Sequence, residues 1–196
     1  MGKLDLIESA YLEQWSMLPA DNLEHEAYQA ELRQKFQRLI QERSRNIIDY
    51  QDIITYGDEI TSRLAAHRID MIARERYREA TSFDEVHQVY KDLIKTTDGG
   101  NYLEYCCSGT LVVLGMLSLA STPKQCITAF LAIDYTKAGK KAAEQAIEKT
   151  LSAKPISEES LKELQAAYSE ARHYTVKRMS KPIINKLHAC KTTNTK

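Results

Sequence analysis

Residues 102–120, YLEYCCSGTLVVLGMLSLA, constrain the fold more than any other part of the chain, because they hold a single charge, Glu104, and are apolar all the way around a helix. A helix without a polar face has to be enclosed. Asn101 and Glu104 have the spacing of a capping box, so we expect the helix to begin there. We therefore predict that the other helices are arranged around this one.

A second capping box follows this stretch directly. Thr122 and Gln125 have the spacing of a helix cap and its partner, and Pro123 stands at the first helical position, where proline is favoured. Two helices joined by so short a connection pack antiparallel. We predict a helical hairpin over residues 102–151, in which the second arm is one helix from Pro123 to about Leu151.

This hairpin suits two environments. Its first arm has 19 residues, enough for a bilayer core of about 30 Å, and Ala138, Ala142 and Ala146 form a row that allows close helix contact in a membrane or in a bundle. Polar residues dilute the first arm, however, and the apolar part of the second arm is too short to cross back. We expect a buried core helix and keep entry of the hairpin into lipid as the alternative.

Length and composition favour one helical domain. A chain of 196 residues with 43% hydrophobic content is large enough to enclose such a helix. Seven glycines and four prolines are few, and no run of alternating β-branched residues is present, which disfavours β folds. We predict an all-α, single-domain helical bundle of six or seven helices around the central hydrophobic helical hairpin. It covers residues 1–190, with a disordered tail at 191–196.

The other helices are predicted from apolar residues spaced by three and four. They cover residues 4–18, residues 23–78 as one or two helices with a break between about Asp49 and Asp58, residues 83–94, and residues 157 to about Pro182. Ser82 with Glu85 is a capping box, and Ser157 is a cap with Ile156 and Leu161 in the positions of a hydrophobic staple. The second helix has a thin apolar stripe, so we expect most of its surface to be wet.

The cysteines and the amino terminus favour an intracellular protein. The first residues have no basic start followed by an apolar core, and they do not fit the myristoylation pattern. The four cysteines have neither zinc spacing nor the pattern of a disulfide framework: Cys106, Cys107, Cys126 and Cys190. We expect reduced packing cysteines. Lipidation of the Cys106 and Cys107 pair, with peripheral membrane association, is the alternative.

Charge is balanced in total but not along the chain. Residues 1–30 hold six acids against Lys3, whereas residues 171–196 hold seven lysines or arginines and no acid. We expect the two ends to attract each other, or the basic end to dock on an acidic partner or an anionic membrane. The candidate residues of that surface are Lys177, Arg178, Lys181 and Lys186. A net charge of zero argues against nucleic-acid binding as the main function.

Two acid and histidine pairs have metal-ligand spacing: Asp84 with His87, and Glu170 with His173. Two such pairs, with carboxylates such as Glu104 from other helices, build a di-metal site in a four-helix bundle. By chance, however, 27 acids and five histidines in this length give roughly 0.7 such pairs. We therefore favour acids that complement helix dipoles and surface histidines over a metal site, and we expect no cofactor.

The motifs do not favour an enzyme, because the sequence has no phosphate loop, nucleophile elbow or zinc motif. Eleven tyrosines against three phenylalanines leave many rings with a polar tip, which suits partner surfaces. We expect a protein-protein interaction module of the adaptor, chaperone-like or effector type, with its contact surface on the second helix and the tyrosine-bearing faces. The alternatives are a membrane-active protein whose 102–151 hairpin inserts into lipid, and a di-metal carboxylate enzyme.

Overall fold

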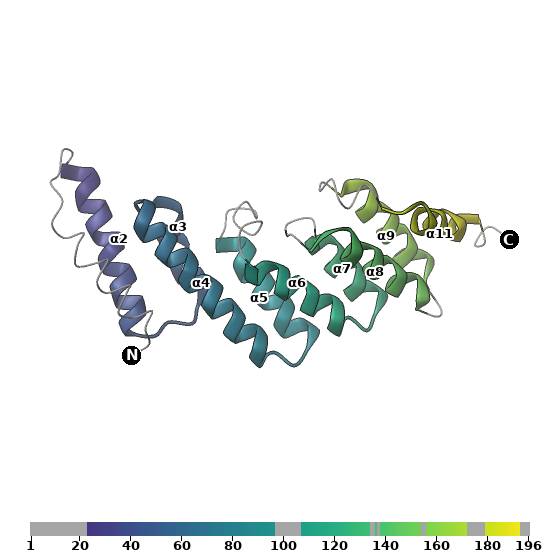
Figure 1. Ribbon diagram of the computed structural model, residues 1–196, viewed down its shortest axis with the longest axis horizontal. Coiled ribbons are helices and arrows are strands. Elements are labelled where there is room, and N and C mark those ends of the chain that lie inside the picture. The colour runs from purple at the N-terminus through teal and green to yellow at the C-terminus, as the bar shows by residue number, and fades with distance from the viewer. Residues whose placement is uncertain are drawn as a thin grey trace. The chain divides into compact units, whose positions relative to one another are not determined.

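The computed structural model of the chain describes residues 23–96, 107–133, 136, 138–153, 156–171 and 179–192 (Figure 1). These residues contain no β-strand, which confirms the all-α class. They form nine α-helices rather than the expected six or seven, because several predicted helices are broken. The chain divides between Ile72 and Ala73 into two compact units. One domain over residues 1–190 stays a prediction, and the helix expected at 4–18 lies outside the described residues.

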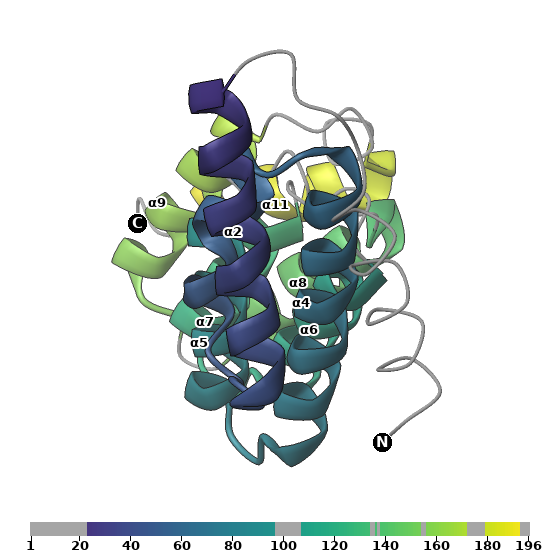
Figure 2. The ribbon, with the colours of Figure 1, turned by 90° about the vertical axis from the view of Figure 1, so that its left-hand side faces the viewer.

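The second unit is a stack of helices. It contains the end of α4 (Glu59–Glu79), then α5 (Phe83–Thr96), α6 (Cys107–Leu119), α7 (Pro123–Ile133), α8 (Gly139–Ser152), α9 (Glu158–Glu170) and α11 (Lys181–Thr192). From α5 to α9 each helix packs on the next, α6 also packs on α8, and α7 on α9. The helices therefore form two layers, with α5, α7 and α9 in one and α6 and α8 in the other (Figure 2). Stacked helix pairs of this kind are typical of helical-repeat proteins.

The hairpin of α6 and α7 forms as predicted at its turn, but its second arm does not. The Thr122 N–H donates to Gln125 Oε1 at 3.3 Å, and the Gln125 N–H donates to Thr122 Oγ1 at 3.3 Å, so the capping box is present. The single helix expected from Pro123 to about Leu151 is wrong, because α7 ends at Ile133 and α8 starts at Gly139. Gly139 has φ +76°, which a continuing helix cannot contain.

The described part of the central helix is not enclosed on every side, contrary to the sequence prediction. Val112, Val113 and Met116 are fully buried. On the other side of α6, Leu111 is 41%, Leu114 40% and Leu119 39% exposed. The two layers of the second unit cover only part of the circumference of α6, so its apolar composition exceeds what packing requires. Among the described residues, no helix combines the length and the apolar composition needed to cross a membrane.

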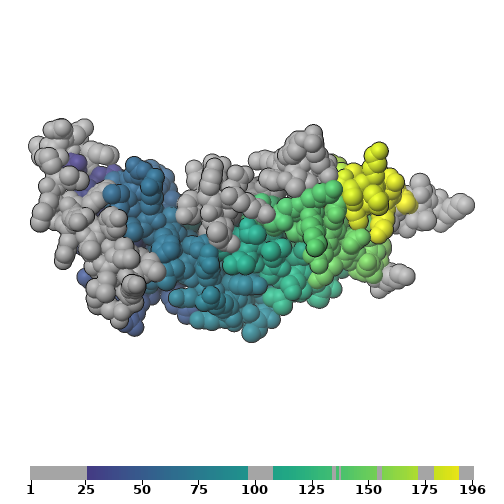
Figure 3. Space-filling model, in the orientation of Figure 1, coloured from purple at the N-terminus to yellow at the C-terminus, as the bar shows by residue number. Residues whose placement is uncertain are grey.

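The last two described helices are separated where one continuous helix was expected. Ser157 Oγ accepts the Ser160 N–H at 3.0 Å, which confirms the predicted start of α9. The helix expected to continue to Pro182 instead ends at Glu170, and Pro182 lies in the first turn of α11, where a missing N–H costs little. α11 runs to Thr192, so the expected tail at 191–196 begins with helical residues. The yellow atoms of α11 lie against the green atoms of α8 (Figure 3).

The first unit holds α2 (Leu23–Gln41), the 3-10 helix η1 (Ile47–Tyr50), α3 (Gln51–Tyr56) and the start of α4. Residues 23–78 are therefore more divided than the one or two helices expected. The predicted break lies at Gly57 and Asp58. A second break follows α2, where Arg43 has φ +52°, a left-handed conformation that nothing in an arginine predicts.

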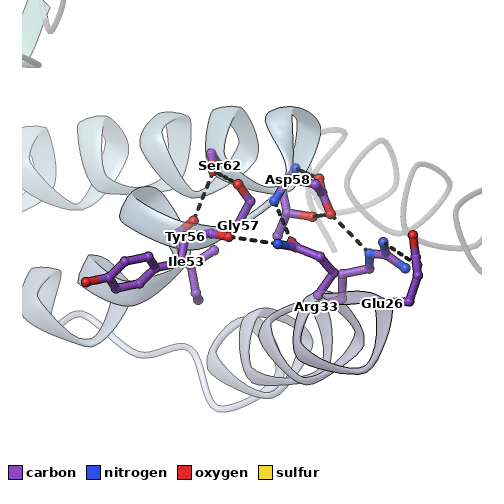
Figure 4. Close-up of polar contacts among 9 residues, drawn as sticks. Glu26, Arg33, Ile53, Tyr56, Gly57, Asp58 and Ser62 are labelled. Atoms are coloured by element: carbon purple, nitrogen blue, oxygen red, sulfur yellow. Dashed lines mark hydrogen bonds and ion pairs between the residues drawn. The ribbon is translucent and has the colours of Figure 1, made fainter. Parts of the chain in front are cut away.

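A polar cluster holds the break at Gly57 (Figure 4). The amide of the buried Gln29 donates from Nε2 to the Tyr56 carbonyl at 2.9 Å, and its Oε1 accepts the Asp58 N–H at 2.7 Å. Asp58 then caps α4 by accepting the Thr61 N–H at 2.8 Å. The α2 helix therefore fixes both sides of the break through one side chain.

Candidate functional site

The residues predicted for a metal site are only partly within the described chain. Asp84 and His87 lie on α5 and Glu170 at the end of α9, whereas Glu104 and His173 lie outside the described residues. The described residues contain no group of three His, Cys, Asp or Glu that could hold a metal. The di-metal site stays a prediction.

His87 belongs to an aromatic cluster on α5. Its ring centroid lies 5.6 Å from that of Phe83 and 6.3 Å from that of Tyr90. Burial lowers the pKa of His87, Lys91 lowers it further, and the nearby Asp84 opposes both effects. The neutral imidazole is therefore favoured, which suits packing between two rings.

The basic surface predicted near the end of the chain is partly engaged with α8. Lys186 Nζ lies 3.2 Å from Glu148 Oε1, and the Ser180 N–H donates to Glu144 Oε1 at 2.7 Å. That hydrogen bond is the main reason that the pKa of Glu144 is lowered. Lys181 is exposed, and Lys177 and Arg178 lie outside the described residues. The described contacts thus attach α11 to α8.

The contact surface expected on the second helix is also used in packing. Phe36 and Leu39 of the predicted stripe are buried, as is Leu32, and the Phe36 ring meets Tyr50 edge-on at 6.2 Å between centroids. Among the described residues of this unit, Tyr28 and Tyr56 form an exposed aromatic pair, with centroids 6.4 Å apart. Phe36 and Leu39 are therefore used in packing, and a contact surface on this helix stays a prediction.

Two helix turns in the second unit are built in the same way. Forty residues separate Ser82 from Thr122 and Glu85 from Gln125. Glu85 Oε2 accepts the Thr81 and Ser82 N–H groups at 2.7 and 3.1 Å. Gln125 Oε1 accepts the Ser121 and Thr122 N–H groups at 2.9 and 3.3 Å. The sequence ATSFDE at residues 80–85 and ASTPKQ at 120–125 therefore encode one repeated turn.

The helices around these turns repeat the same buried positions. Pairs of buried residues that lie forty apart are Ala73 and Val113, Val86 and Cys126, Val89 and Ala129, Tyr90 and Phe130, and Leu93 and Ile133. α8 repeats the pattern of α6 at a distance of thirty residues, in Val112 and Ala142, Val113 and Ala143, Met116 and Ala146, and Leu117 and Ile147. The chain thus contains an internal structural repeat. Its signal in the sequence is the pair of capping boxes, Ser82 with Glu85 and Thr122 with Gln125, which lie forty residues apart.

The repeats differ most at the exposed positions of α6. Arg74 and Glu79 of α4 correspond to Leu114 and Leu119 of α6, and Glu144 and Lys149 of α8 correspond to the same two leucines. Only α6 is apolar at these two positions, whereas Leu111 corresponds to Met71 of α4 and Lys141 of α8. We call Leu111, Leu114 and Leu119 the leucine strip.

Two neighbouring helices reach the leucine strip. A side chain at Gly115 would overlap Cε2 of Tyr77, and Gly115 is four residues from both Leu111 and Leu119, so the Tyr77 ring of α4 covers α6 between these two leucines. At the end of α6, Lys149 Nζ donates to the carbonyls of Leu117 and Ser118 at 2.7 and 3.2 Å. The strip is therefore a shallow apolar surface between α4 and α8. An apolar composition on all sides of α6 predicts burial of the whole helix, so the strip cannot be recognised from the sequence alone.

Comparison of the chain with protein-family models, with curated proteins and with solved structures gave no match.

Proposed function

We propose that this chain is a protein-binding module that binds its partner through the leucine strip of α6. One observation supports this function: two residues of the strip, Leu114 and Leu119, are apolar at positions where the equivalent helices α4 and α8 carry charged residues, which are Arg74, Glu79, Glu144 and Lys149. The fold therefore accepts charged residues at these positions. Single exposed leucines are ordinary, but three on one side of one helix are a feature of interaction surfaces.

The strip would act as an anchor and not as the whole interface. Each of its leucines is about 40% exposed, and complete burial of one leucine is worth about 2 kcal/mol. Covering the remaining surface of all three then contributes on the order of 2 kcal/mol. A micromolar complex needs about 8 kcal/mol, so the partner also contacts the polar surroundings. Central apolar anchors with a polar rim are the usual anatomy of such interfaces.

Substitutions copied from α4 test this function. The variant Leu114→Arg, Leu119→Glu gives α6 the residues found at the same positions of α4. Its thermal unfolding midpoint should stay close to that of the parent chain, because both residues are good helix formers at exposed positions. The matched control is Leu131→Lys, which removes a leucine that is 43% exposed on α7 and copies Lys91.

The three proteins serve as baits in lysate of the native source. The parent chain and Leu131→Lys should retain the same protein in stoichiometric amount, and the α6 double variant should lose it. Purified, that protein should bind the parent chain directly and the double variant at least tenfold more weakly. Equal retention by all three baits would overturn the function. So would binding to phosphatidylcholine and phosphatidylglycerol vesicles that only the α6 variant loses, because the strip would then be a lipid-binding surface.

A further inference from the structure

The leucine strip has the shape of a site for a helix. Leu111 and Leu119 are eight residues apart, so the strip is about 12 Å long, or just over two helical turns. The Tyr77 ring lies against the bare backbone at Gly115, between Leu111 and Leu119, and continues the apolar surface from one leucine to the other. The three leucines are each about 40% exposed, so they line a surface rather than project from it. A cylinder with apolar residues on one face fits such a surface.

The fold already contains a helix bound to part of the equivalent surface of α8, where Lys149, the equivalent of Leu119, contacts α6 instead. Glu144 and Glu148 of α8 correspond to Leu114 and Ser118 of α6. Glu144 accepts the Ser180 N–H at the start of α11, and Glu148 lies 3.2 Å from Lys186 of α11. Ile183 and Leu187 of α11 are buried, at 5% and 2% exposure. An amphipathic helix is thus what this face accepts at the end of the repeat.

We propose that the partner segment bound by the strip is an amphipathic α-helix, which lies on α6 as α11 lies on α8. This inference rests on the proposed protein-binding function. α6 has Leu114 where α8 has Glu144. The bound helix therefore contacts α6 through apolar side chains, whereas α11 contacts α8 through a backbone N–H and a lysine. These side chains are spaced three, four and seven residues apart, as in helix-in-groove complexes.

Two other modes of peptide binding fit the surface less well. Addition of a strand requires an exposed sheet edge, and the described residues contain no strand. Proline-rich peptides need grooves lined with several aromatic residues, whereas Tyr77 is the one aromatic side chain placed at the strip by a described contact. A lipid surface favours apolar residues that project, and the partly covered leucines do not.

Peptide selection tests the inference without knowledge of the partner. A phage library of random 16-residue peptides is selected on the parent chain after depletion on the Leu114→Arg, Leu119→Glu variant. Enriched peptides should carry large apolar residues at positions i, i+3 or i+4, and i+7, and should gain helical circular dichroism on binding. They should bind the α6 double variant at least tenfold more weakly and Leu131→Lys as well as the parent chain. Proline at the centre of such a peptide should abolish binding.

Enrichment of alternating or proline-rich sequences would overturn the helix, as would failure to enrich any peptide that separates the parent chain from the variant. The lysate experiment separates the protein-binding function from the inference that the bound segment is a helix. A protein retained through the strip, in the absence of a helical peptide, would leave the protein-binding function standing and remove only the helix. If neither a protein from the lysate nor a helical peptide binds through the strip, both the protein-binding function and the helical partner segment are wrong.

Discussion

Arg76 Nη1 lies 2.7 Å from Asp92 Oδ2, and the Asp92 side chain is only 8% exposed. Gln88 Nε2 donates to the other carboxylate oxygen at 2.8 Å. Forty residues later the same two positions hold Met116 and Ala132, both buried. One framework therefore accepts an ion pair between α4 and α5 and an apolar pair between α6 and α7, which makes the energy of the ion pair measurable by substitution.

Replacing Arg76 alone should be costly. Arg76→Met leaves the Asp92 carboxylate buried beside a single remaining donor, and loss of one partner of a buried pair costs about 3 kcal/mol. The double variant Arg76→Met, Asp92→Ala copies Met116 and Ala132, and we expect it to unfold within about 1 kcal/mol of the parent chain or to be more stable. Urea unfolding followed by circular dichroism measures both. A double variant as unstable as the single one would contradict the equivalence of the two hairpins.

Gly115 and Tyr77 should be energetically coupled. Gly115→Ala gains up to about 1 kcal/mol of helix propensity but overlaps the Tyr77 ring, so a net loss of about 1 to 2 kcal/mol is expected. In a Tyr77→Ala background the overlap is gone, and Gly115→Ala should become stabilising. The double-mutant cycle gives the coupling energy.

Gly139 provides the control for that cycle. A side chain at Gly139 would meet nothing within 4 Å, but its φ of +76° is unfavourable for alanine. Gly139→Ala should therefore destabilise the chain by about 1 kcal/mol, equally with and without Tyr77. Equal coupling of Tyr77 to both glycines would mean that the ring does not act through contact with Gly115.

The two repeated turns should differ in their response to acid. Hydrogen bonds from Thr81 and then Ser82 lower the pKa of Glu85, whereas Gln125 makes the same bonds without a titrating group. A lowered folded-state pKa gives stability that is present above the ordinary glutamate value of about 4.3 and is lost as the pH falls through the folded value. Glu85→Gln should therefore remove part of the decline in melting temperature below about pH 4.3, and Gln125→Glu should add to it.

Melting temperatures between pH 3 and pH 7 check this for the parent chain and both variants. At pH 7 Gln125→Glu should be the most stable of the three, since a carboxylate in the first turn also complements the helix dipole. Parallel pH profiles for all three proteins would contradict the assignment of Glu85 to the cap.

Cap chemistry is the part of this fold that the sequence predicts best, because it is local. Ser82, Thr122 and Ser157 each accept the backbone N–H three residues later, as their spacing predicts. The break at Arg43 could not be predicted, because nothing in an arginine favours a left-handed conformation, whereas the break at Gly139 has a local signal in the glycine itself.

The leucine strip of α6 could not be predicted from hydropathy. Hydropathy describes how apolar a helix is, whereas burial depends on how many neighbours reach it. Leu114 and Val113 are adjacent and similar in character, yet one is 40% exposed and the other fully buried. Leucines that packing requires can be told from those that it does not by comparing equivalent positions of the repeats. Arg74 occupies the position of Leu114, so packing does not require a leucine there. This comparison needs the alignment of the repeats, which the structure supplies.

In the first unit, Gln29 should control the break between α3 and α4. Its amide satisfies the Tyr56 carbonyl and the Asp58 N–H, so Gln29→Ala leaves two partly buried backbone groups without partners and should cost about 2 kcal/mol. Amide exchange at Asp58 should accelerate in the same variant, because its acceptor is gone. The exposed Gln37 on the same helix is the matched control, and Gln37→Ala should change neither quantity. Since Asp58 also caps α4 and pairs with Arg33 at 3.1 Å, unchanged exchange in Gln29→Ala would mean that these contacts alone fix the break.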